Sequence, residues 1–254
     1  MIFIKIIIYL FYLINFIKTI IYIYTIMKDV QYYENLIEKD IVELFKWAPG
    51  IIFPLGNIMQ IINMYKTKKA DDVDEITYVM FFIGNLGGFL FNRLYLSLKT
   101  YLAYILPSMF YIYILTLKYD LEKDKEKEII YSIILSIILV LTVCTVILLR
   151  NNKYFKSLIH VISNTAGFLP AILFPVATIL QLDKLIKNKK AGGVSLYTWI
   201  LMFIGNVGLY ALSGRYKNWK SILGYLGSAA LNLAIVFYLV HFKKKEEHKG
   251  KNIS

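Results

Sequence analysis

An internal repeat constrains this chain more than any other feature of its sequence. Residues 49–87 and 170–208 align without a gap at an offset of 121 residues. Chance matches of Ile or Phe between two apolar segments are common, but matches of Pro, Gln, Gly and Asn at fixed spacing are not. The identical pairs include Pro54/Pro175, Gln60/Gln181, Gly84/Gly205, Asn85/Asn206 and Gly87/Gly208. The pattern therefore predicts a duplicated structural unit.

The composition indicates a membrane protein. Of the 254 residues, 58% are hydrophobic, whereas soluble domains have about 45–50% apolar residues. The formal net charge of +12 does not indicate nucleic-acid binding, because the basic residues form short clusters between apolar runs, where they set membrane topology. Seven runs have approximately spanning length: 49–65, 76–95, 100–117, 129–149, 161–183, 196–213 and 221–242.

The repeat and the spans together predict an all-α membrane protein of seven transmembrane helices. Each unit has three helices, and an odd number would invert the second copy. The extra span at 129–149 restores the orientation of the first. We therefore expect two parallel three-helix bundles joined by a linker helix (3+1+3), related by an axis along the membrane normal.

The chain is predicted to divide into six segments. The apolar leader at 1–27 reads as a signal or targeting segment, an extra helix or an interfacial anchor. The expected segments after it are an amphipathic surface segment at 28–48, the first repeat at 49–117, a charged loop and linker helix at 118–149, the second repeat at 150–242 and a basic, disordered polar tail at 243–254. Within the fourth segment, 118–128 is expected to be a solvated loop.

The distribution of basic residues predicts the orientation. Lys and Arg number 16 on the side that holds the C-terminus and 11 on the other. The excess favours a cytoplasmic C-terminus, with residues 28–48 on the opposite face.

Symmetric prolines and amides are the candidate functional residues. Pro54 and Pro175 are expected to kink the first helices and act as hinges, or as static kinks. Gln60 and Gln181 would bond carbonyls freed at the kinks or line an inner gate. Asn85 and Asn206, amides in otherwise apolar helices, either face a central cavity or tie helices together. The candidate sets are thus the two asparagines, Asn85 and Asn206, and the hinge or gate residues Pro54, Pro175, Gln60 and Gln181.

Charged and metal-binding groups are scarce in the spans. The 17 acidic residues lie outside them, apart from Glu128 and Asp183 at span ends. Three dispersed histidines and the single Cys144 do not predict a metal site or a cofactor. No nucleophile–base set or carboxylate pair within the spans predicts an enzyme. A proton-coupled carrier needs a carboxylate in the membrane, so a proton-coupled function is not expected.

The repeat resembles the SWEET/PQ-loop (MtN3-like) transporter superfamily from about residue 48 onward. The resemblance rests on FPLGNIMQIINMYKTKKA and FPVATILQLDKLIKNKKAGGVS. The second copy is also similar to the chloroplast maltose-exporter branch and, more faintly, to the mannose-P-dolichol utilisation branch. The resemblance implies helix order 1-3-2 in each unit, a solute site between the units at mid-membrane, and alternating access by rocking of the two units.

The match is that of a divergent member. Met59 and Leu180 precede Gln60 and Gln181 where the family has Pro-Gln, and Tyr78 and Trp199 occupy places where it has prolines. The resemblance implies that positions one turn after the asparagines, Phe89 and Tyr210, line the sugar pocket. Asn232, on the last span, joins the candidate solute-binding residues.

The function expected from the sequence is facilitated diffusion of a sugar or a similar neutral, hydroxylated solute across a bilayer. The alternatives are a non-transporting factor of the endoplasmic reticulum, in dolichol-linked sugar use or cargo reception, and a proton-coupled amino-acid exporter. A multi-pass protein of an endomembrane or organelle envelope is favoured over one of the plasma membrane. The expected partners are the solute and the lipid, with no nucleic acid; homo-oligomerisation is left open.

Overall fold

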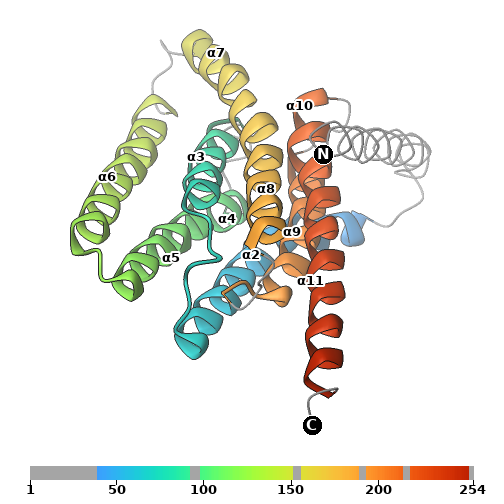
Figure 1. Cartoon of the computed structure of the whole chain (residues 1–254). Helices are drawn as coiled ribbons and strands as arrows, with labels where there is room; N and C mark the ends of the chain where they lie inside the picture. The colour runs from blue at the N-terminus through green and yellow to red at the C-terminus, as the bar shows by residue number, and fades with distance from the viewer. Residues whose placement is uncertain (1–38, 92–97, 151–155, 189–192, 214–217, 252–254) are drawn as a thin grey trace, which may run out of the picture. The chain divides into compact units, whose positions relative to one another are not determined.

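A computed structural model of the chain describes residues 39–91, 98–150, 156–188, 193–213 and 218–251 (Figure 1). The chain divides into two compact units, Met1–Phe45 and Lys46–Ser254. The features below belong to the second unit. The predicted leader at 1–27 lies outside the described residues, as does the predicted amphipathic segment up to residue 38.

Every regular element of the described residues is a helix. In chain order the elements are α2 (Lys39–Thr67), α3 (Glu75–Phe91), α4 (Leu98–Thr100), the π-helical η2 (Tyr101–Ile105), α5 (Leu106–Glu122), α6 (Lys125–Arg150), α7 (Lys156–Ala166), α8 (Phe168–Asn188), α9 (Leu196–Ser213), α10 (Trp219–Ser221), the π-helical η4 (Ile222–Gly227) and α11 (Ser228–Lys251). The elements from α4 to α5 form one span, and so do those from α10 into α11.

Within the described ranges, four helical segments are long and apolar enough to cross a membrane. They are Leu98–Glu122, Lys125–Leu148, Val161–Asn188 and Trp219–His241, and the apolar α3 and α9 are shorter. These helices indicate a membrane-embedded protein. The predicted span 49–65 lies within α2 but is not one of the four, because Asn57, Gln60 and Asn63 make it less apolar.

Helix α6, the predicted linker, has the most exposed apolar surface of the four spans. Only 17% of its apolar window is buried, compared with 50% in each of the other three. Ile133, Ile137 and Leu141 are more than half exposed. In a bilayer these side chains would contact lipid. Helix α6 therefore contributes few side chains to the packed core of the protein.

The prediction that 118–128 forms a solvated loop is wrong. Helix α5 continues to Glu122, α6 begins at Lys125, and a tight turn joins them (Figure 1). Buried Lys118 forms an ion pair with Glu122 one turn further on. Lys123 caps α5 in the left-handed conformation (φ 61°), and the carboxylate of Asp124 accepts a hydrogen bond from the backbone N–H of Lys127 (3.1 Å). Capping at both helix ends shortens the turn.

The expectation of a disordered tail is wrong as far as Lys251. Helix α11 extends from Ser228 to Lys251 without interruption. The last part of α11, from Lys243 to Lys251, is rich in Lys and Glu, which have high helix propensity. A polar composition alone therefore does not end the helix.

The two repeats pack together through glycines. Helix α3 of the first repeat lies against α8 of the second. A Cβ atom on Gly84 would come within 2.4 Å of the ring of Phe174, and one on Gly205 within 2.7 Å of the ring of Phe53. Both contacts therefore need glycine. Within the second repeat, η4 and α11 pack against both α8 and α9.

Candidate functional site

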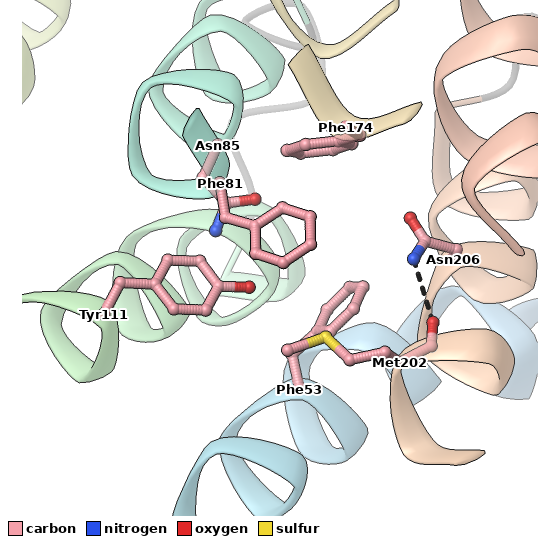
Figure 2. Close-up of a pocket in the computed structure, with 7 residues that line it drawn as sticks. All are labelled: Phe53, Phe81, Asn85, Tyr111, Phe174, Met202 and Asn206. Carbon is pink, nitrogen blue, oxygen red and sulfur yellow. Dashed lines mark hydrogen bonds between the residues drawn. The ribbon is translucent and has the colours of Figure 1, made fainter. Parts of the chain in front are cut away.

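A small cavity lies between the two repeats, and helices from both contribute side chains to it (Figure 2). About 10 Å³ of it can hold the centre of a water molecule. That is room for roughly one water. The lining side chains are Phe53, Phe81, Asn85, Tyr111, Phe174, Met202 and Asn206.

The lining follows the internal repeat. Six of the seven residues form three pairs at the offset of 121: Phe53/Phe174, Phe81/Met202 and Asn85/Asn206. The seventh, Tyr111, has Asn232 as its counterpart at the same offset. A cavity lined by equivalent residues of two repeats lies on the pseudo-two-fold axis that relates them.

The chemistry of the lining is uncharged. Two amides and one phenol face the cavity, and the other four lining side chains are apolar. In the part of the chain that the structure describes, no group of three or more His, Cys, Asp or Glu residues could hold a metal ion. The lining suits contact with apolar faces and hydrogen bonding to neutral polar groups.

One end of the interface is held by two glutamines that reach across to the opposite repeat. Gln60 donates to the carbonyl of Gly193 (2.7 Å) and accepts from the backbone N–H of Ser195 (3.1 Å). At the equivalent positions, Gln181 donates to the carbonyl of Asp72 (2.9 Å) and accepts from the backbone N–H of Asp74 (3.1 Å). We call these four bonds the glutamine closure. Each repeat binds the loop of the other in the same way.

Threonines near the starts of α3 and α9 form a second reciprocal pair of hydrogen bonds between the repeats. The Thr77 hydroxyl donates to the carbonyl of Ala177 (3.0 Å), and the Thr198 hydroxyl donates to the carbonyl of Gly56 (2.9 Å). Both the donors and the acceptors are 121 residues apart. On the axis itself, the carboxylate of Asp72 accepts from the backbone N–H of its counterpart Gly193 (3.3 Å).

A tyrosine pair holds the other end. The hydroxyls of Tyr104 and Tyr225 lie 2.9 Å apart, and both residues are buried. Each lies in a π-helical turn, η2 or η4, and the two turns begin 121 residues apart. Such turns are frequent at functional sites. We call this contact the tyrosine closure.

The two closures bracket the cavity. Asp74 contributes to the glutamine closure, and Gly88 lies against the ring of Tyr104 in the tyrosine closure. Gly88 is 14 positions after Asp74 in the sequence, roughly 21 Å along a helix. Cavity-lining Phe81 and Asn85 lie between. The cavity therefore lies between the two closures along the length of α3.

The structure brings some of the predicted site residues together and separates others. Asn85 and Asn206 line the cavity. Phe89 and Tyr210 are buried but do not line it, and Phe89 packs against Tyr101. Asn232 is buried and accepts a hydrogen bond from Thr178 (3.4 Å) instead of lining the cavity. The cavity is lined by Phe81 and Met202, which lie one helical turn before the asparagines, and not by the residues one turn after them.

The predicted hinge residues lie next to the cavity walls. Pro54 and Pro175 are buried within α2 and α8 and directly follow Phe53 and Phe174 in the sequence. Both helices continue past their prolines. A change of angle at either proline would move the adjacent ring, but a hinge role stays a prediction. The partners of Gln60 and Gln181 lie in the loops of the opposite repeat.

Sequence reasoning did not select Phe53, Phe81, Tyr111, Phe174 or Met202 for the site. The offset carried a signal for four of them, because both pairs are equivalent in the repeat: Phe53/Phe174 directly precede the prolines, and Phe81/Met202 precede the asparagines by one turn. Large apolar residues of this kind fill most helix interfaces, so the signal was not specific. Comparison of the chain with known protein families, curated proteins and solved structures finds no match.

Proposed function

We propose that this chain is a membrane transporter that moves a neutral, hydroxylated solute between the two sides of a bilayer, with a sugar as the first candidate. The observation that carries the proposal is the position of the cavity. It lies between the two repeats, with the glutamine closure on one side of it and the tyrosine closure on the other. Such an arrangement suits alternating access, in which one seal opens while the other stays closed.

The uncharged lining supports a neutral solute. Aromatic rings and Met202 offer apolar surface, and the amides of Asn85 and Asn206 offer hydrogen bonds without demanding a charge. The buried lysines of the described residues already have partners: Lys118 forms an ion pair with Glu122, and Lys220 donates a hydrogen bond to the carbonyl of Asn164. This speaks against a receptor for carboxylate-bearing cargo, which would need a free buried cation.

The small cavity volume supports a closed form of the transporter. Pockets for small organic ligands usually have about 300–1,000 Å³, whereas this cavity has only about 10 Å³ for the centres of water-sized molecules. The walls would therefore separate when solute enters. Opening one closure at a time would provide that separation. The resemblance to the SWEET/PQ-loop superfamily, noted from the sequence, agrees with this mechanism.

Uptake into proteoliposomes tests the proposal. Purified protein is reconstituted and offered a panel of radiolabelled neutral sugars, with protein-free liposomes as one control. Met202→Trp, which would fill the cavity, is the second control. We expect time-dependent uptake of at least one sugar and its loss in the Met202→Trp variant. Equal fluxes in all three preparations would overturn the proposal.

A further inference from the structure

The two repeats are equivalent in position but not in hydrogen bonding. Asn57 and Thr178 lie at equivalent positions of α2 and α8, and both are fully buried. The Thr178 hydroxyl donates to the carbonyl of Phe174 (2.9 Å) and contacts the amide oxygen of Asn232 (3.4 Å). Neither amide atom of Asn57 has a hydrogen-bond partner.

The same asymmetry recurs at the asparagine pair. In the second repeat, the amide nitrogen of Asn206 donates to the carbonyl of Met202 (2.9 Å), as Figure 2 shows. In the first repeat, the amide nitrogen of Asn85 is buried without a partner. The hydroxyl of Tyr111, which lines the cavity, interacts with both amides, but not within hydrogen-bond geometry. Of the amide nitrogens of Asn57, Asn85 and Asn206, the two without a partner thus belong to the first repeat.

Leaving these groups unpaired is costly for the protein. A buried amide without a partner loses its bonds to water and gains none. The second repeat shows that the fold can avoid this cost, because threonine at the equivalent position bonds to its own helix. Asn57 lies one turn after Phe53, so it is on the same face of α2 as that cavity-lining ring. Its amide is therefore available to a ligand when the walls separate.

We infer that the cavity binds its solute asymmetrically, with the first repeat supplying the amide N–H donors, while the amide nitrogen of Asn206 stays bonded to Met202. Asn57, Asn85 and Tyr111 form the polar side, and Phe174 and Met202 on the second repeat form the apolar side. A neutral solute with hydroxyl groups on one edge and C–H surface on the other fits this arrangement. The identity of the ligand as the transported solute rests on the proposed function, whereas the asymmetry does not.

The first arm of the test is the stability of the protein without solute. Asn57→Thr installs the residue of the equivalent position, whose hydroxyl can bond the carbonyl of Phe53. We expect its melting temperature in detergent, followed by tryptophan fluorescence, to rise by a few degrees. The matched control, Thr178→Val, loses its bond to Phe174 and should melt a few degrees lower. A merely structural Asn57 would give a lower melting temperature in Asn57→Thr as well.

The second arm is binding, with D-glucose and maltose as the probes. Either sugar should raise the melting temperature of the wild-type protein in a concentration-dependent way. Asn57→Thr should weaken that apparent affinity about ten-fold, and Thr178→Val should change it less than two-fold. Asn57→Leu serves as a second variant without a hydroxyl.

Three results would overturn the inference. One is a lower melting temperature in both Asn57 variants. Another is equal loss of sugar affinity in Asn57→Thr and Thr178→Val. The third is the absence of any shift of the wild-type protein with either sugar. Flux is not measured in these assays, so a protein that binds sugar asymmetrically but moves none would contradict only the proposed function.

Discussion

Tyr104 and Tyr225 are equivalent residues of the two repeats, and their hydroxyls bond to each other across the pseudo-two-fold axis at 2.9 Å. A residue can contact its own counterpart only on the axis, so this pair marks one point of it. Asp72 and Gly193 mark a second point at the other end of α3. The line between them passes the cavity, which explains why equivalent residues line it.

The first prediction concerns the tyrosine closure. Tyr104→Phe or Tyr225→Phe removes one hydroxyl and leaves the other unpaired. Since a hydrogen bond contributes about 1 kcal/mol, we expect the form open at this end to become about five-fold more populated. A cysteine at Met202, in a Cys144→Ser background, should then react faster with an impermeant thiol reagent from that side.

The matched control for this experiment is another tyrosine pair. Tyr65 and Tyr113 also bond through their hydroxyls (2.7 Å), but both are exposed and belong to the same repeat. Tyr113→Phe should leave the labelling rate unchanged. Equal acceleration by Tyr113→Phe and Tyr104→Phe would show that the axial pair is no seal.

The second prediction concerns the glutamine closure. Gln60→Leu removes the partner of the buried Gly193 carbonyl and Ser195 N–H, and Gln181→Leu removes the partner of the Asp72 carbonyl, which is buried, and of the Asp74 N–H, which is part-buried. We expect each change to destabilise the closed form by roughly 2 kcal/mol and to speed labelling from this end. The two variants should have similar effects because the bonds are equivalent. Met59→Leu, at an exposed neighbouring position, is the control, and a strong effect there would contradict the interpretation.

The third prediction concerns the glycine contact beside the cavity. In Gly84→Ala the new methyl group would overlap the ring of Phe174, which approaches to 2.4 Å of that position. The ring would be pushed from its site in the cavity wall. We expect uptake to fall at least several-fold while the protein still purifies as a folded species. Ile83→Ala, at a partly exposed neighbour, should keep near-normal uptake; loss of folding in Gly84→Ala alone would assign this glycine to packing.

The fourth prediction concerns energy coupling. The cavity lining has no carboxylate or histidine, and Asp183 at the end of its span pairs with Lys187 one turn on. We expect uptake to equilibrate, to run in both directions and to change little when a pH gradient is collapsed. Asp183→Asn should keep this behaviour. Concentrative, proton-driven uptake that is lost in Asp183→Asn would instead support a proton-coupled exporter.

The fifth prediction concerns topology. The excess of basic residues predicts that the C-terminus is cytoplasmic and that residues 28–48 lie on the opposite face. Single cysteines at Ser254 and at Lys28, introduced into a Cys144→Ser background, should be labelled from opposite sides of intact membranes. Labelling of both from one side would exclude the arrangement of three, one and three spans.

Much of this architecture could be read from the sequence. The gapless repeat at an offset of 121 already predicted equivalent helices, and the structure has helices over all seven apolar runs where it describes them. The amides of Asn85 and Asn206 stood out because polar groups in apolar helices need a reason. These properties depend only on residue type and spacing along one chain, so the sequence by itself determined them.

Only the tertiary structure decided which neighbours the equivalent residues meet. Spacing of four residues puts Phe81 and Phe89 on the same face of α3 as Asn85. The packing of the helices places Phe81 at the cavity and Phe89 against Tyr101. Likewise, no spacing rule links Gln60 to a loop 133 residues away. The difference between unpaired Asn57 and satisfied Thr178 depends on which carbonyls and amides lie within 3.5 Å. Such distances arise from helix packing, which a linear pattern does not encode.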